Sequence, residues 1–224
     1  MTISETTEAQ MREVLARYPR KRSALMPLLH LVQADEGHIS QEGLRKVAEL
    51  VELSEAEVTA VSTFYTMYLK RRSGNVRVGV CINSLCAVLG GDAIWDALVE
   101  HCGVGHNQTT DDGAVTLERI ECQAACTHAP VMTANWEFLD DMTVEKAKEV
   151  VDSARAGRAI SSTRGPVVRS FGEAERTIAG VDDGLTSEGD HRDDRMLAGL
   201  RLAQDNGDAE RTAQAQAAAA GRGN

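Results

Sequence analysis

The chain has 224 residues and a formal net charge of −10, and no apolar run approaches the roughly 20 residues that span a bilayer. We therefore expect one or two soluble domains, with no leader peptide and no membrane insertion, because the N-terminal residues are polar and acidic. The acidity is concentrated in residues 73–152, which carry four basic and thirteen acidic side chains. Nucleic acid is not expected as a partner, because phosphate contacts need the opposite charge.

The first part of the chain, residues 1–72, is predicted to be helical. Apolar residues recur at helical spacing over 8–19, 23–37 and 40–53. Ser54 then begins the pattern "SEAE", a capping box in which the side chains of Ser54 and Glu57 bond to each other's backbone N–H groups. The sequence therefore predicts an N-terminal bundle of about four helices.

The apolar period changes at Gly74. Residues 75–81 alternate as a strand, residues 90–103 read as a helix between glycines, and Thr143 caps a last helix. Two further strands are expected at 114–122 and 129–139. This order predicts an α/β (or α+β) domain of thioredoxin-like pattern over residues 73–152, although chain order alone does not determine the order of the strands.

The remaining residues, 153–224, have a different composition. Only eleven of these 72 residues are Ile, Leu, Val, Met or Phe, too few to offset the entropy of ordering the segment. We therefore expect an extended or disordered tail. Two pieces, 165–180 and 195–203, carry apolar residues at helical spacing, which suits docking on a partner subunit.

All five cysteines lie between residues 81 and 126, and four of them form two pairs. Cys81 and Cys86 have the spacing C-x4-C, and Cys122 and Cys126 have the spacing C-x3-C. Each pair follows a predicted strand, so the two loops are expected at the same ends of neighbouring strands. Cytosolic thiols stay reduced, and four convergent thiolates in such a protein indicate a metal site.

The spacing of the pairs favours an iron-sulfur cluster over zinc. Structural zinc typically uses narrower C-x2-C knuckles, whereas a 2Fe-2S cluster is longer than one ion and suits wider pairs. A zinc-stabilised interaction module stays open as the alternative. Thiol-disulfide catalysis is not expected, because the C-x-x-C motif is absent.

The other candidate residues have simpler interpretations. Cys102 is expected to be a half-buried free thiol. His128, beside the second pair, could act as a ligand or as a donor to a sulfur, and His30 and His38 are expected to pack or to cap a helix. No Ser-His-Asp set and no Gly-rich phosphate loop is present, so no catalytic residue is predicted.

Residues 10–152 contain four stretches that resemble one family. They read "ALMPLLHLVQADEGHIS", "VSTFYTMYL", "VRVGVCINSLCAVLGG" and "ECQAACTHAPVMTANWEFLDDMT". The sequence resembles the 24 kDa subunit family of respiratory NADH-quinone oxidoreductase, whose bacterial members are known as the E subunit. The resemblance implies one 2Fe-2S cluster, bound by Cys81, Cys86, Cys122 and Cys126 in a thioredoxin-like domain after a helical bundle.

The same resemblance implies a role and partners. The chain would be an electron-transfer subunit, part of an oxidoreductase rather than a carrier of a substrate site. Its cluster would exchange single electrons with the flavin of the NADH-binding subunit, near the large iron-sulfur subunit, peripherally on the cytoplasmic side of the membrane. The equivalent subunit of an NAD-linked hydrogenase or formate dehydrogenase is the alternative. Gln123 and Ala124 depart from the Leu-Gly pair common in the family.

Overall fold

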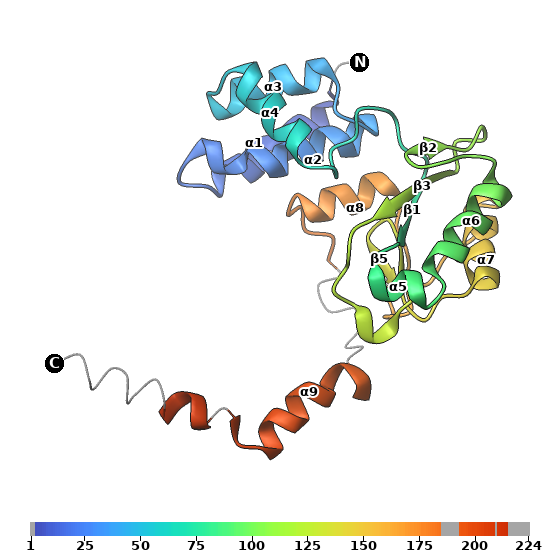
Figure 1. Cartoon of the computed structure of the whole chain (residues 1–224). Coiled ribbons are helices and arrows are strands. Elements are labelled where there is room, and N and C mark those ends of the chain that lie inside the picture. Colours follow the sequence, from blue (N-terminus) through green and yellow to red (C-terminus); the bar gives the residue numbers. More distant parts are fainter. Residues whose placement is uncertain (1–2, 185–192, 209, 215–224) are drawn as a thin grey trace. The chain divides into compact units, whose positions relative to one another are not determined.

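The structure, a computed structural model, describes residues 3–184, 193–208 and 210–214 (Figure 1). The chain divides into two compact units, Met1–Gly189 and Asp190–Asn224. The first unit holds the N-terminal helices and a five-stranded sheet, and the second holds the helix α9 (Asp194–Asp205). No helix within the described ranges is long and apolar enough to cross a membrane.

Four helices form the N-terminal part, as the apolar spacing predicts. Serine side chains accept backbone N–H groups at the starts of three of them, and the capping box of Ser54 and Glu57 is present. The second helix is the central one, since most of its residues are buried against its neighbours. The helices are α1 (Glu5–Ala16), α2 (Leu25–Glu36), α3 (Gln41–Val51) and α4 (Glu55–Phe64), with a 3-10 turn at Lys21–Ala24.

The linker after α4 starts at Tyr65. The helix ends at Phe64, and Tyr65 has an extended backbone. Tyr68 is buried and its hydroxyl donates a hydrogen bond to the carbonyl oxygen of Met26 at 3.0 Å. The linker is thus held against α2 before the chain enters the sheet.

The sheet has the order β2-β3-β1-β4-β5. Strands β1 and β3 pair in parallel, with Cys81 opposite Ile120, and the other pairs are antiparallel. The helices α6 and α7 lie side by side against one face (Figure 1), where Val78, Val80 and Leu117 form a core with their apolar residues. The strands are β1 (Val76–Cys81), β2 (Gln108–Thr109), β3 (Val115–Ile120), β4 (Met132–Ala134) and β5 (Glu137–Leu139); the helices are α5 (Ser84–Val88), α6 (Gly91–Cys102) and α7 (Val144–Arg155).

The strand expected at 129–139 is a hairpin instead. Asn135 and Trp136 both have positive φ, 45° and 71°, and join β4 to β5 as a two-residue turn. The Asn135 side chain explains why: its Oδ1 accepts the backbone N–H of Arg77 at 2.7 Å, and its Nδ2 donates to the carbonyls of Asn75 and Arg169. These bonds to distant residues are not visible in the local pattern.

Residues 156–184 differ from the extended tail that composition predicts. Ser161 and Val167 form a β-bridge, and Arg164 makes two hydrogen bonds to the Asp140 carboxylate. A further helix, α8 (Phe171–Ile178), packs on α2. This helix falls within the piece 165–180, where apolar residues recur at helical spacing. Few apolar residues suffice here, because the segment folds onto surfaces that the rest of the chain supplies, and its docking on a partner subunit stays a prediction.

The inner face of α8 carries a buried carboxylate. Glu175 has no exposed surface, and its two oxygens lie 2.6 Å from Nδ1 of His30 and 2.8 Å from Nε2 of Gln33. His30 also packs against the ring of Tyr68. A segment near the end of the first unit is thereby tied to α2.

The second unit contains the helix predicted within residues 195–203. Asp193 caps α9, and the apolar side chains of Met196, Leu200 and Leu202 are exposed. The rest of the tail prediction, at 185–192, 209 and 215–224, lies outside the described residues. The division of the chain at residues 72 and 152 stays a prediction.

Candidate metal centre

The two cysteine pairs come together at one edge of the sheet. Cys81 is the last residue of β1, and Cys122 follows the end of β3 by two residues. Because these strands are parallel neighbours with Cys81 opposite Ile120, their carboxyl ends lie at the same edge. The expectation that both loops leave from the same ends of adjacent strands thus agrees with the observed register.

The first pair is buried. The short helix α5 turns the chain back so that Cys86 contacts Cys81, and both thiols lie in an apolar cluster with Ala125 and Val131. Burial is the largest cause that raises the pKa of Cys86 to about 11, and the neighbouring sulfurs of Cys81 and Cys126 add to it. The backbone N–H of Val131 donates to the Cys86 sulfur and acts in the opposite direction.

The second pair is exposed. The Sγ atoms of Cys122 and Cys126 lie 3.6 Å apart, and the backbone N–H of Ala124 points to Cys122 Sγ at 3.4 Å. Ala124 has φ +55°, a left-handed conformation that tightens the loop. The hydrogen bond with Cys122, and then its charge, raise the pKa of the Cys126 thiol.

The sulfur positions can be compared with those that metal ligation needs. Thiolates about 2.3 Å from a tetrahedral ion lie about 3.8 Å from each other, close to the 3.6 Å between Cys122 and Cys126. Cys81 and Cys86 lie together in one buried cluster. Within the described ranges, no three Cys, His, Asp or Glu side chains converge on one point as ligands of a single ion. Two pairs of thiols fit a group with two irons, each holding two sulfurs.

Glycine and backbone groups support the loops, and sequence reasoning did not single them out. A Cβ on Gly91, at the start of α6, would lie 2.7 Å from the carbonyl oxygen of Cys81 and 2.9 Å from that of Cys86. Only glycine lets α6 approach the first loop so closely. The glycine pair in "VLGG" was the available signal.

Exposed apolar side chains lie on and just after α5. Leu85, Val88 and Leu89, on and just after α5, are 45%, 82% and 52% exposed. They adjoin Cys86 in the sequence and form a surface that we call the α5 patch. Such a cluster of exposed leucine and valine side chains indicates a contact with another protein.

The remaining residues considered from the sequence are one cysteine and three histidines. Cys102 is half-buried at the end of α6, as expected, and burial raises its pKa. His128 is buried, with Nδ1 at 3.4 Å from Asp141 Oδ2. His38 lies against the carbonyl of Glu36, and His30 is packed in the bundle, which agrees with their expected roles.

Residues 11–155 match the family model of the thioredoxin-like [2Fe-2S] ferredoxin, and the chain belongs to this family. The predicted fold, a helical N-terminus followed by a thioredoxin-like domain, is thereby confirmed. Family membership implies one 2Fe-2S cluster, as expected from the cysteine spacing.

Curated relatives agree with the resemblance found in the sequence. The E subunit of the NADH-quinone oxidoreductase of Mycobacterium bovis is 50% identical over 200 residues, which cover 89% of this chain and 79% of the relative. NADH-quinone oxidoreductase subunit 2 of Thermus thermophilus is 33% identical over 159 residues, covering 70% of this chain and 88% of the relative.

A solved structure shares the fold. One chain of an NAD+-reducing [NiFe]-hydrogenase, in the air-oxidized state, superposes with a TM-score of 0.54 at 15% identity. The match covers 59% of this chain but only 23% of that chain. At this identity the likeness concerns the fold alone.

Proposed function

We propose that this chain is the iron-sulfur electron-transfer subunit of the NADH-oxidising arm of an NADH-quinone oxidoreductase. The observation that carries the proposal is the pair of cysteine loops at the carboxyl ends of β1 and β3, which brings four thiols to one edge of the sheet. The names of the relatives at 50% and 33% identity support the assignment.

Cys81, Cys86, Cys122 and Cys126 would hold one 2Fe-2S cluster, with each pair binding one iron. Such a cluster, when bound, takes up and releases one electron at a time. The thiols must lose their protons to bind iron, and the raised pKa of Cys86 is then offset by the metal charge and by the N–H group of Val131.

The protein groups around the sulfurs have two tasks. The backbone N–H groups of Val131 and Ala124 orient the sulfurs and stabilise negative charge on them. The apolar cluster around Cys81 keeps water away from the first pair, whereas the second pair is exposed. We infer that electrons enter and leave on the side of Cys122 and Cys126.

The partners follow from this role. The flavin-bearing, NADH-binding subunit is the proposed electron donor, and the large iron-sulfur subunit is the proposed neighbour. The α5 patch is a candidate contact, since it adjoins the cysteine loop, and the exposed apolar residues of α9 are a second candidate. The chain would lie on the cytoplasmic side of the membrane through its complex.

Metal content and paramagnetic resonance test the proposal. Purified protein should contain two iron and two acid-labile sulfide per chain, as expected for a 2Fe-2S cluster. The sample reduced with dithionite should give a 2Fe-2S resonance. Serine substitution of any of the four cysteines should abolish or shift the signal, and Cys102→Ser is the matched control. Zinc without iron would refute the electron-transfer role and favour a zinc-stabilised module.

The hydrogenase and formate dehydrogenase alternatives differ in their neighbouring subunits. Mild purification of the tagged chain from its native cells, followed by mass spectrometry, should return the flavin-binding and large iron-sulfur subunits together with subunits of the quinone-reducing arm. Recovery of a nickel-iron or formate-oxidising subunit instead would transfer the assignment to one of the alternatives.

A further inference from the structure

A cavity is lined by the linker that joins α4 to β1 and by residues of the sheet. Its volume is about 340 Å³, and a second cavity of about 330 Å³ adjoins it, sharing Thr66, Arg77, His106 and Asn107. The lining of the first comes from residues 66–77, 106–108 and 116, so it includes neither cysteine loop. Its size is at the lower end of the range for small-molecule sites.

The charge of this cavity is opposite to that of the chain. Among the described residues that line it there is no aspartate or glutamate. The lining contains Lys70, Arg71, Arg72, Arg77 and His106. In a chain of net charge −10, such a grouping favours an anionic ligand. We call it the cationic cavity.

Of the four lysine and arginine side chains, three are held by the protein and one is not. The ammonium of Lys70 donates to the carbonyl and hydroxyl oxygens of Ser62, and Arg72 donates through Nε to the carbonyl of Glu36. Arg71 has no hydrogen bond or ion pair to any described residue. The guanidinium of Arg71 is therefore available to a ligand, as are the terminal nitrogens of Arg72.

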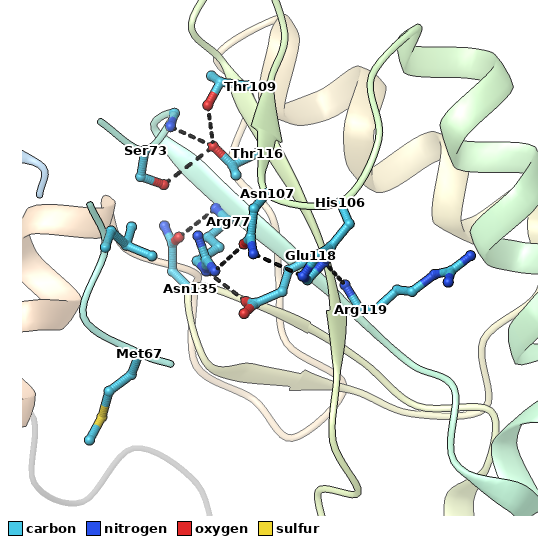
Figure 2. Close-up of polar contacts among 12 residues, drawn as sticks. Met67, Ser73, Arg77, His106, Asn107, Thr109, Thr116, Glu118, Arg119 and Asn135 are labelled. Carbon is cyan, nitrogen blue, oxygen red and sulfur yellow. Dashed lines mark hydrogen bonds and ion pairs between the residues drawn. The ribbon is translucent and has the colours of Figure 1, made fainter. Parts of the chain in front are cut away.

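Arg77 forms the floor of the cavity. It is only 6% exposed, and its Nε donates to Glu118 Oε2 at 2.7 Å while Nη2 donates to Asn107 Oδ1 at 2.9 Å (Figure 2). Its other terminal nitrogen, Nη1, has no hydrogen-bond partner among the described residues, and it is not one of the fully buried polar atoms left without a partner, so solvent or a ligand in the cavity can reach it.

The side chains of His106 and Asn107 point two hydrogen-bond donors at each other. The backbone N–H of Arg119 donates to Nδ1 of His106 at 3.0 Å. A neutral imidazole that accepts at Nδ1 carries its proton on Nε2. Nδ2 of Asn107 lies 2.8 Å from that Nε2, because Oδ1 of the same amide accepts from Arg77. Rotating the Asn107 amide by 180° would instead place its Nδ2 donor against the Nη2 donor of Arg77.

We infer that the cationic cavity binds a phosphate group, either as the free ion or as a monoester of a small organic molecule. Its tetrahedral oxygens can accept from the linker arginines on one side and from Arg77, His106 and Asn107 on the other. A phosphate oxygen beside the exposed His106–Asn107 pair can accept from Asn107 Nδ2, which has a second N–H, or from Nε2 of His106. The adjoining cavity, lined in part by Met67 and Trp136, offers space for an organic part.

Titration calorimetry of the full chain tests this inference. Inorganic phosphate, AMP and adenosine are titrated separately at constant ionic strength, and the ring signals of His106 are followed by NMR. Phosphate or AMP should bind, shift the His106 signals and weaken with added salt, whereas adenosine should not bind. Tighter binding of AMP identifies a monoester as the ligand, and equal binding identifies the free ion. Absence of binding by both would overturn the inference.

Variants locate the binding. Arg71→Ala removes an exposed cation that supports no other residue, so the fold should be unaffected, and phosphate or AMP should bind about 10-fold more weakly, which corresponds to about 1.4 kcal/mol. Arg77→Gln should abolish binding but removes a buried ion pair, so Arg71→Ala is the decisive variant. The control is Arg45→Ala, in a separate cavity that also contains Glu8, Glu42 and Glu49. An equal loss in the control, or none in Arg71→Ala, would refute the assignment to this cavity.

Discussion

The attachment of α8 to α2 can be tested at Glu175. Its carboxylate is fully buried and accepts from Gln33 Nε2 at 2.8 Å, with His30 Nδ1 at 2.6 Å from the other oxygen. Glu175→Ala leaves the His30 nitrogen without its acceptor, while Gln33 keeps its bond to the carbonyl of Met67. The substitution also leaves a cavity between the two helices.

The magnitude follows from the burial of these groups. Leaving a buried polar group without its hydrogen-bond partner costs about 1–3 kcal/mol. For a chain of this size each kcal/mol lowers the melting temperature by about 2–4 °C, so the expected loss is about 2–12 °C. Glu175→Gln keeps an acceptor for Gln33 and should lose less. Glu149→Ala, on the exposed face of α7, is the control and should stay within about 0.5 kcal/mol of the wild type.

Equilibrium unfolding in urea, followed by circular dichroism, measures these differences. Hydrogen exchange of the amides of residues 171–178 reports on α8 directly, and Glu175→Ala should accelerate it selectively. If Glu175→Ala were as stable as Glu149→Ala, or if these amides exchanged like an unstructured peptide in the wild type, the packing of α8 on α2 would be refuted.

Three further predictions concern the loops and the first helix. Gly91→Ala should displace the first cysteine loop, cost about 1–3 kcal/mol and reduce iron content, whereas Gly199→Ala, which meets no neighbouring atom, should not. In the cluster-free chain the exposed second pair should be alkylated before the buried first pair, and cluster assembly should protect all four thiols but not Cys102, as mass spectrometry would record. Burial raises the pKa of Asp35, but hydrogen bonds from Ser4 and the first turn of α1 outweigh it and leave the pKa below its ordinary value. The stabilisation is therefore full above about pH 4 and is lost as pH falls through the lowered pKa, so Asp35→Asn should destabilise the chain at pH 7 and much less in acid.

Much of the candidate metal centre could be predicted from patterns among residues that are close in the sequence. The alternation before Cys81 and the apolar pattern before Cys122 predicted two strands, and the spacing of the pairs predicted a shared metal group. Those signals work because strand periodicity and loop length depend on residues that are neighbours in the chain. The groups that orient the sulfurs, the N–H of Val131 and the close approach at Gly91, are backbone features without a side-chain signature.

The amino-acid sequence by itself determined the helical N-terminus, its serine caps, the α/β character of the second part and the four cysteines that we propose as ligands, since each rests on spacing within a few residues. Only the tertiary structure decided the hairpin at Asn135, the docking of α8 and the cationic cavity. Glu175 contacts a residue 145 positions away, and in its own helix it looks like a solvated charge. Its burial depends on a surface that exists only after α2 has folded, so composition alone assigned that segment to a tail.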